Sequence, residues 1–152
     1  MALTGNGFTV ISEGSPTLVK FHVRTVPFVV AKPYLKAAQH LTKFLAAVEP
    51  VTEAGWDGGY AHRLVRGSTT TWSEHASGTA IDWNASQHPM GVKGEPGWTA
   101  DQERVIRWYL ATQIGQMWEW GADYSRPDSM HFCLKDRKVW DAAVKSGQWW
   151  TK

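Results

Sequence analysis

Apolar and polar residues alternate in the first thirty residues of the chain. Within 18–23, valine and phenylalanine occupy one face of an extended segment and His22 falls on the other, polar face. This period of two predicts a β-strand with His22 at the surface. Short apolar runs at 8–11 and 28–30, separated from it by glycine and proline, predict two further extended segments.

The spacing of apolar residues changes to three and four between residues 34 and 48. This period predicts an amphipathic α-helix, with Pro33 in its first turn and Pro50 after its end. His40 lies beside the apolar stripe and is predicted to be a helix-surface residue. The stripe consists of Leu35, Ala38, Leu41, Phe44, Leu45 and Val48.

The second half of the chain alternates between short strands and helices. Residues 79–84 have the pattern of a strand that directs Ile81 and Trp83 to the core and Asp82 to the opposite face. A capping box at 99–102 predicts the start of a helix. That helix is expected to run to about Ile114, to end at Gly115, and to bury Val105, Ile106, Tyr109, Leu110 and either Gln113 or Ile114.

Three more elements complete the pattern. Residues 118–120 and 130–134 have the character of short strands, and residues 136–145 that of a last helix ending at Gly147. The chain contains no repeats or linkers, so we expect one domain over residues 1–152, with an α+β fold.

Composition limits the classes of protein to which this chain can belong. Its ten tryptophans fit either core positions, the favoured interpretation, or a groove of aromatic rings for a sugar or peptide. A net charge of +2 without a block of Lys and Arg argues against nucleic acid as a partner. The single cysteine, Cys133, excludes an internal disulfide. No apolar run is long enough to insert into a membrane, and the first residues lack the pattern of a signal peptide.

Four side chains suggest a zinc site. His75 and Asp82 lie on either side of Gly78, and Asp128 and His131 follow later in the chain. Two neutral imidazoles and one carboxylate would leave Zn²⁺ with a formal charge of +1, which suits hydrolytic zinc with an open position for water. Asp128 could then accept the proton of the attacking water. The spacing of His75 and Asp82 alone is common and does not establish a site.

The context of these residues is more specific. The chain contains Ser73-x-His75-x-x-Gly78-x-Ala80-x-Asp82, then Trp120-Gly121, then Asp128-x-x-His131-Phe132. This order resembles the signature of the M15 zinc peptidases, the family of D-Ala-D-Ala carboxypeptidases and L-alanyl-D-glutamate peptidases that includes VanY-like enzymes and many phage endolysins. The resemblance covers a core of about residues 56–134.

The resemblance implies roles for individual residues. It makes His75, Asp82 and His131 the zinc ligands and Asp128 the general base. It also implies a hedgehog- or DD-peptidase-like fold, in which a small antiparallel sheet carries the zinc site and packs with about three helices.

An arginine and a serine are further candidates. The stretch from Tyr60 to Arg63 matches a Tyr-x-x-Arg setting whose arginine holds a substrate carboxylate or the developing oxyanion in the family, and Arg66 is the alternative. Ser73 is expected either to contact the substrate and orient the site or simply to form a turn.

The chain departs from the family pattern at two places. Cys133 stands where a polar or acidic residue is frequent; it shares a strand face with His131 and is expected to be a small buried thiol. Gly121-Ala122-Asp123-Tyr124 replaces the more usual Gly-Gly-x-Trp.

Other polar residues near the motif are weaker candidates. Glu119 and Asp123 are less well placed than Asp128 to act as a base. His62 and His88 are expected at the surface, with substrate contact as the alternative.

Together these observations predict a zinc-dependent peptidase that cuts the stem peptides of bacterial peptidoglycan. An endolysin-type L-Ala–D-Glu endopeptidase is favoured over a D-Ala-D-Ala carboxypeptidase. We expect a monomer made in the host cytoplasm and delivered to the cell wall by a holin or a virion. The rivals are a non-catalytic, zinc-stabilised wall-binding module and a wall amidase or muramidase; a muramidase would need paired carboxylates and no metal.

Overall fold

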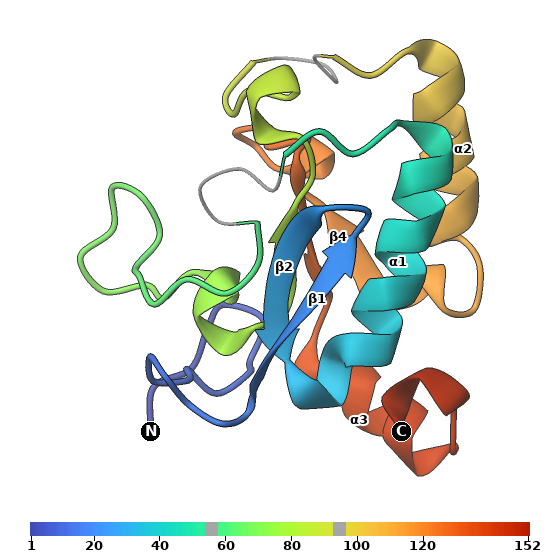
Figure 1. The fold of residues 1–152 in the computed structure, drawn as a ribbon. Helices are drawn as coiled ribbons and strands as arrows, with labels where there is room; N and C mark the ends of the chain where they lie inside the picture. The colour runs from blue at the N-terminus through green and yellow to red at the C-terminus, as the bar shows by residue number, and fades with distance from the viewer. Residues whose placement is uncertain (54–57, 93–96) are drawn as a thin grey trace.

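The computed structural model describes residues 1–53, 58–92 and 97–152. Over these residues the chain forms two small antiparallel sheets and three α-helices, the predicted α+β architecture (Figure 1). The helices are α1 (Leu35–Val48), α2 (Ala100–Leu110) and α3 (Arg137–Lys145). The strands are β1 (Leu18–Val23), β2 (Val26–Ala31), β3 (Ala80–Asp82), β4 (Trp118–Trp120) and β5 (His131–Leu134).

The larger sheet has the strand order β3–β5–β4, so β5 is its central strand. Both of its neighbours run antiparallel to it. Every residue of β3 and β5 is buried, which means that both faces of this sheet are covered. The sheet therefore holds its side chains in a rigid environment.

The strands β1 and β2 form a separate hairpin in which Phe21 lies opposite Phe28. Phe28 stacks on Trp83, with ring centroids 5.9 Å apart and planes 9° from parallel. The hairpin therefore packs against the residue that follows β3. His22 is exposed on the outer face of β1, as the alternation predicted.

The helices α1 and α2 lie side by side on one flank of the molecule, and α3 lies near the C-terminus (Figure 1). The helix α1 has the predicted bounds and buries Leu41 and Leu45 completely. His40 is half-buried, because its Nδ1 lies 2.8 Å from the hydroxyl of Tyr109 on α2. The prediction of a plain surface position for His40 was wrong.

Two predicted elements differ from the structure. Residues 8–11 form no regular strand, although Thr9 makes an isolated antiparallel bridge with Leu3; Gly7 has φ +83°, and Phe8 is buried in the core. The helix α2 starts at the predicted capping box but ends four residues early, at Leu110. The hydroxyl of Thr112 donates to the carbonyl of Tyr109 and accepts from the amide of Gly115, which replaces the next helical turn.

Burial also differs from the prediction on α2. Ile106 and Tyr109 are buried, but Val105 is 43% exposed. The core interpretation of the tryptophans holds for Trp83, Trp98, Trp118, Trp120, Trp140 and Trp150. Trp108 and Trp149 are exposed, and Trp56 lies outside the described residues, as do Gly55, Asp57, Gly94 and Pro96 of the predicted turn-rich loops.

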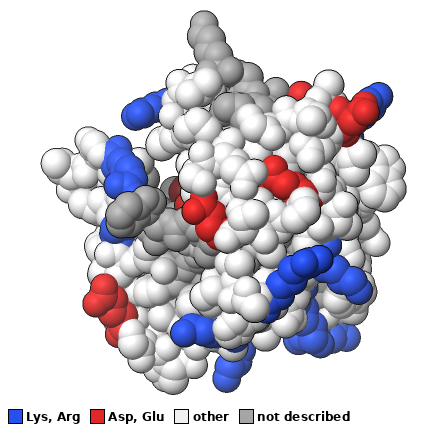
Figure 2. Space-filling model, turned by 45° about the horizontal axis from the view of Figure 1, so that its top comes forward, with Lys and Arg blue, Asp and Glu red and all other residues white. Residues whose placement is uncertain are grey.

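The surface carries mixed charge. On the face shown in Figure 2, Lys and Arg occur in separate groups with Asp and Glu between them. Among the described residues, no helix is long and apolar enough to cross a membrane.

Candidate metal centre

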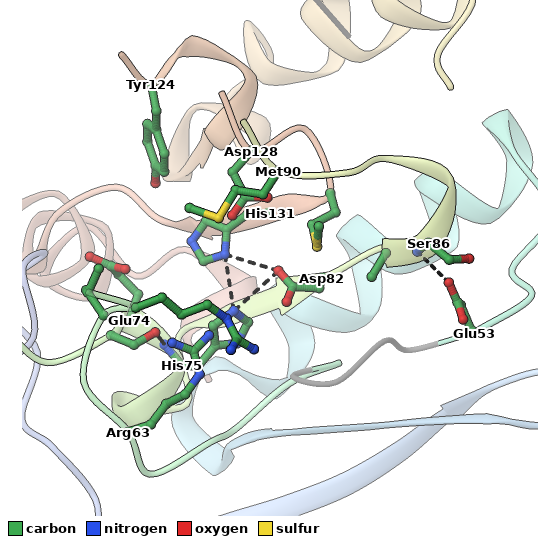
Figure 3. Close-up of a pocket in the computed structure, with 15 residues that line it drawn as sticks. Glu53, Arg63, Glu74, His75, Asp82, Ser86, Met90, Tyr124, Asp128 and His131 are labelled. Carbon is green, nitrogen blue, oxygen red and sulfur yellow. Dashed lines mark hydrogen bonds and ion pairs between the residues drawn. The ribbon is translucent and has the colours of Figure 1, made fainter. Parts of the chain in front are cut away.

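Three side chains from separate segments converge in the main pocket (Figure 3). Asp82 ends β3, His131 begins β5, and His75 lies in a short 3-10 helix, Glu74–Ser77. The Nδ1 atom of His131 lies 3.2 Å from Nε2 of His75 and 3.2 Å from Oδ1 of Asp82. The third side, from Nε2 of His75 to Oδ1 of Asp82, is 3.3 Å. The three atoms therefore form a nearly equilateral triangle.

This triangle has the size that tetrahedral zinc requires. Ligand atoms at about 2.0–2.1 Å from a tetrahedral Zn²⁺ lie about 3.3–3.4 Å from one another. Two imidazole nitrogens and one carboxylate oxygen are also a donor set that zinc prefers. The residues present thus fit a zinc ion, and the three of them form a group able to hold a metal.

Strand pairing places two of the three candidate ligands. Asp82 and His131 are directly opposed partners in the antiparallel pair of β3 and β5. Opposed residues in such a pair have Cβ atoms about 4.5–5.5 Å apart, which is close enough for both side chains to reach one ion. The next residues along the strands, Ile81 and Phe132, point to the core and are fully buried.

Local backbone geometry places the third candidate, His75. The Ser73 hydroxyl accepts a hydrogen bond from the His75 amide at 3.3 Å and caps the 3-10 helix. Gly78 ends this helix at φ +67°, and a Cβ there would lie 2.5 Å from the amide nitrogen of Ala31. Only glycine satisfies both the left-handed backbone and the close approach to β2.

A hydrogen bond fixes the orientation of the His75 ring. Its Nδ1 lies 2.7 Å from the carbonyl oxygen of Gly59, so this nitrogen carries the proton and donates it. Nε2 then faces Asp82 and His131. This ring orientation leaves Nε2 as the nitrogen that would bind a metal.

The side chains of the triangle shift the pKa values of Asp82 and His131 in opposite directions. Burial raises the pKa of Asp82, but the imidazoles of His75 and His131 lower it by more, so the carboxyl pKa lies well below its ordinary value. Burial lowers the pKa of His131, but hydrogen bonds with Asp82 and Cys133 raise it well above its ordinary value. In the metal-free chain, a proton on His131 therefore compensates the Asp82 carboxylate.

Asp128 lines the same pocket and has an unsatisfied oxygen. Its Oδ1 is buried and has no hydrogen-bond partner among the described residues. Burial is the main cause of its raised pKa, which His131 lowers and Asp82 raises further. A buried carboxyl oxygen without a partner, beside three candidate ligands, is well suited to accept a proton from water.

The turn that carries Asp128 is held from two sides. The Asp128 amide donates to the Gly121 carbonyl at 2.8 Å, and a Cβ on Gly121 would lie 2.3 Å from the Asp128 carbonyl oxygen. The indole N–H groups of Trp98 and Trp120 both donate to the carbonyl of Ser129, at 3.1 and 2.8 Å. These contacts fix the backbone next to Asp128.

The pocket has a volume of about 1230 Å³, and the candidate residues lie around it. Arg63, Ser73 and the alternative arginine, Arg66, all line it. Arg63 donates from Nη1 to the carbonyl of Leu64 at 3.0 Å. The lining consists of Glu53, Arg63, Val65, Arg66, Ser73, Glu74, His75, Asp82, Ala85, Ser86, Met90, Tyr124, Asp128, Met130 and His131.

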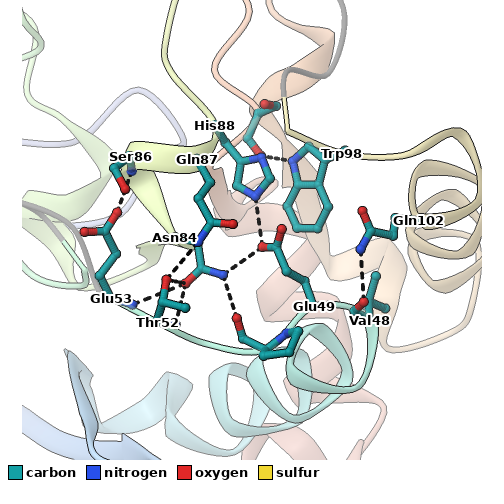
Figure 4. Close-up of polar contacts among 12 residues, drawn as sticks. Val48, Glu49, Thr52, Glu53, Asn84, Ser86, Gln87, His88, Trp98 and Gln102 are labelled. Atoms are coloured by element: carbon teal, nitrogen blue, oxygen red, sulfur yellow. Dashed lines mark hydrogen bonds and ion pairs between the residues drawn. The ribbon is translucent and has the colours of Figure 1, made fainter.

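A buried polar network supports the pocket behind β3 (Figure 4). Glu49, after the end of α1, lies 2.9 Å from Nε2 of His88 and accepts a hydrogen bond from Nδ2 of Asn84 at 2.8 Å. Asn84 has a left-handed backbone, φ 42°, and its Oδ1 accepts from the amide of Thr52 at 2.8 Å. The His88 ring also stacks on Trp98 at 3.9 Å between centroids. The network therefore joins α1, the end of β3 and the segment beside Asp128.

His88 was expected at the surface or, alternatively, in contact with the substrate, and both predictions were wrong. It is fully buried and does not line the pocket. Its partners Glu49 and Trp98 are distant in the sequence, so no local pattern indicated this position. Glu53, Ser86, Met90 and Tyr124 also line the pocket, although they were not predicted to do so. Only Tyr124 had a sequence signal, its place just after the Trp120-Gly121 motif.

The remaining candidates occupy less central positions. Cys133 is buried, as expected, and lies 3.4 Å from the hydroxyl of Tyr124. Asp123 is paired with Arg107 and Glu119 is not among the pocket residues, so neither competes with Asp128. His62 is exposed and packs on Trp72. No tryptophan is among the described residues that line this pocket, so the groove of aromatic rings is not found there.

An α+β fold with a buried His–Asp–His cluster open to a pocket, beside an unsatisfied carboxylate, is the architecture of a single-metal hydrolytic centre. Residues 66–134 match the sequence profile described as D-alanyl-D-alanine carboxypeptidase, which supports the resemblance to the M15 zinc peptidases. The matched segment contains all three candidate ligands and Asp128. Neither a curated protein nor a solved structure matches the chain.

Proposed function

We propose that the protein is a zinc-dependent endopeptidase that hydrolyses the L-Ala–D-Glu bond in the stem peptides of bacterial peptidoglycan, as an endolysin does. The observation that carries the proposal is the triangle of His75, Asp82 and His131 beside the unsatisfied Asp128. The match of residues 66–134 to a profile of peptidoglycan-acting peptidases supports the class of substrate.

Each residue has a defined task in this proposal. A zinc ion held by His75, Asp82 and His131 would supply a Lewis acid that acidifies water and polarises a peptide carbonyl. Asp128 accepts the proton of the attacking water and passes it to the leaving amine, for which its raised pKa is suited. Arg63, at the pocket wall, attracts anionic groups of the substrate, and Ser73 orients the site through the backbone of His75.

The size of the pocket supports an endopeptidase. A volume of about 1230 Å³ exceeds the roughly 300–1,000 Å³ of ordinary small-molecule pockets, whereas a terminal dipeptide would fill only a small part of it. The second candidate, a D-Ala-D-Ala carboxypeptidase, is favoured by the description of the matching family profile. Both candidates use the same catalytic residues.

One experiment separates these candidates. Purified protein is incubated with peptidoglycan sacculi, and the soluble products are identified by mass spectrometry. Peptides with a new D-Glu amino terminus support the proposal, whereas free D-Ala indicates the carboxypeptidase. A wall-binding module would sediment with the sacculi and release neither product, and a chelator-resistant release of reducing sugars would indicate a muramidase.

Peptidoglycan as the partner, the monomeric state and delivery by a holin or a virion stay predictions. Chelation followed by zinc addition is the matched control in the same assay, since it distinguishes the metal centre from a contaminating hydrolase.

A further inference from the structure

Tyr124 lines the pocket from the wall opposite to Arg63, with its hydroxyl end directed toward the side where His131 lies (Figure 3). The Tyr124 and His131 rings are tilted by 50°, with centroids 6.0 Å apart. The phenol ring therefore lies in the wall of the pocket, next to a candidate zinc ligand. None of the tasks described above uses this group.

The hydroxyl of Tyr124 has only a weak partner in the structure. It lies 3.4 Å from Sγ of Cys133, and a thiol sulfur is a poor hydrogen-bond acceptor. A tyrosine phenol has an ordinary pKa of about 10, so it keeps its proton at neutral pH. Turning this proton toward an anionic oxygen would therefore exchange a weak hydrogen bond for a stronger one.

The backbone that carries Tyr124 is held rigidly. Its amide donates to the carbonyl of Gly121 at 3.1 Å. The preceding Asp123 accepts two hydrogen bonds from Arg107, at 2.5 and 2.7 Å, and the Arg107 guanidinium lies 4.5 Å from the centre of the Trp120 ring. A hydrogen-bond donor fixed before the reaction is the arrangement that stabilises developing charge most effectively.

We propose that Tyr124 is a catalytic residue whose hydroxyl donates a hydrogen bond to the substrate oxygen that becomes negatively charged when water attacks the peptide carbonyl. The inference rests on the proposed peptidase function. It adds a donor on the Asp128 side of the pocket, facing the positive charge of Arg63 on the other side.

The test compares Tyr124→Phe with the wild-type protein. This substitution removes one oxygen atom and keeps the ring. We expect kcat on a muropeptide to fall on the order of 10²-fold, with KM and the zinc content per chain unchanged. Tyr109→Phe is the matched control, because it also removes a hydroxyl that contacts a histidine, but on the interface of α1 and α2. It should leave kcat at the wild-type value.

A second measurement does not need turnover. A phosphinate analogue of the Ala-Glu dipeptide, whose anionic tetrahedral group imitates the attacked carbonyl, is titrated calorimetrically into each zinc-loaded protein. Weaker binding to Tyr124→Phe than to wild type and Tyr109→Phe supports the contact. Unchanged phosphinate affinity, or a kcat within twofold of wild type, overturns it, and so does a loss of zinc together with activity.

The two hypotheses fail differently. If the wild-type protein releases no product from any muropeptide, the proposed peptidase function is wrong. The phosphinate titration then still decides whether the Tyr124 hydroxyl contacts an anionic tetrahedral ligand.

Discussion

Asp82 and His131 are paired positions of adjacent antiparallel strands, and their side chains meet at 3.2 Å between Oδ1 and Nδ1. The sheet thus presents two of the three candidate metal ligands through its regular geometry, without a special loop. His75 is different, because its position depends on a capped 3-10 helix and on a carbonyl from another segment.

Replacement of a candidate ligand should remove the metal. In His75→Ala we expect the zinc content to fall from about one ion per chain to near none, because two protein ligands hold zinc poorly. Metal analysis of the dialysed protein measures this. His62→Ala is the matched control, since His62 is exposed and outside the pocket. Zinc retained at one per chain in His75→Ala would remove His75 from the ligand set.

Replacement of the candidate base should separate binding from chemistry. Asp128→Ala is expected to lower the hydrolysis rate about 10²–10⁴-fold, because the proton of the attacking water loses its acceptor. Zinc content should stay near the wild-type value, since Asp128 is not one of the three clustered ligands. Near-wild-type hydrolysis by this variant would contradict the assignment.

Zinc binding should release a proton at neutral pH. The pKa of His131 in the metal-free protein lies well above 6.5, so its imidazole is still protonated at pH 7 and must lose that proton to bind zinc. Asp82, with its lowered pKa, is already ionised and releases none. The apparent zinc affinity should therefore rise with pH until the pH exceeds the pKa of His131.

Calorimetric zinc titrations in buffers of different ionisation enthalpy count this proton. About one proton per zinc ion is expected at pH 7. Zinc binding that is independent of pH between 6 and 8 would show that His131 is neutral in the free protein.

The network behind β3 should contribute strongly to stability. Glu49→Ala leaves Nε2 of His88 and Nδ2 of Asn84 without their carboxylate partner in a buried environment, at a cost of about 1–3 kcal/mol in the free energy of unfolding. Urea denaturation measures this. The control Glu13→Ala changes an exposed residue and should stay within about 0.5 kcal/mol of wild type. A small effect in Glu49→Ala would show that water replaces the carboxylate.

Two glycines with similar backbone angles should respond differently to alanine. Gly14 has φ +72° and nothing within 4 Å of the position that a Cβ atom would take, so Gly14→Ala should cost only the left-handed strain, about 1–2 kcal/mol. Gly78→Ala adds a clash with the Ala31 amide at 2.5 Å, and we expect a larger loss of stability and weaker zinc binding. Equal losses in the two variants would mean that β2 moves away freely.

Much of the fold follows from local patterns. The alternation of apolar and polar residues predicted β1, and apolar residues spaced three and four apart predicted α1. The capping box formed by Thr99 and Gln102 predicted the start of α2. The end of α2 was predicted wrongly, because the apolar spacing continues past Leu110 while the Thr112 hydroxyl takes over the backbone hydrogen bonds. The spacing of apolar residues carries no information about such hydrogen bonds between a side chain and the backbone.

The candidate site divides in a similar way. The order of the motifs indicated His75, Asp82, Asp128 and His131 as candidate site residues. In the structure all four line one pocket. The partners that orient them are invisible in the motif: Gly59 is a backbone carbonyl, and Glu49 reaches His88 across thirty-nine positions. Such contacts depend on the tertiary fold, so no sequence motif or apolar spacing predicts them.

The carbonyl of Gly59 connects the reaction centre to the N-terminal hairpin. A Cβ at Gly59 would lie 2.0 Å from the carbonyl oxygen of Val29, so this segment rests directly on β2, and the neighbouring Tyr60 amide donates to the same oxygen at 2.6 Å. Both β2 and Gly59 lie outside the residues that the family profile recognises. A transplant of residues 66–134 into another scaffold would carry every ligand and lose the group that aims one of them. The segment needed to orient all three candidate ligands is therefore longer than residues 66–134, the segment that the profile matches.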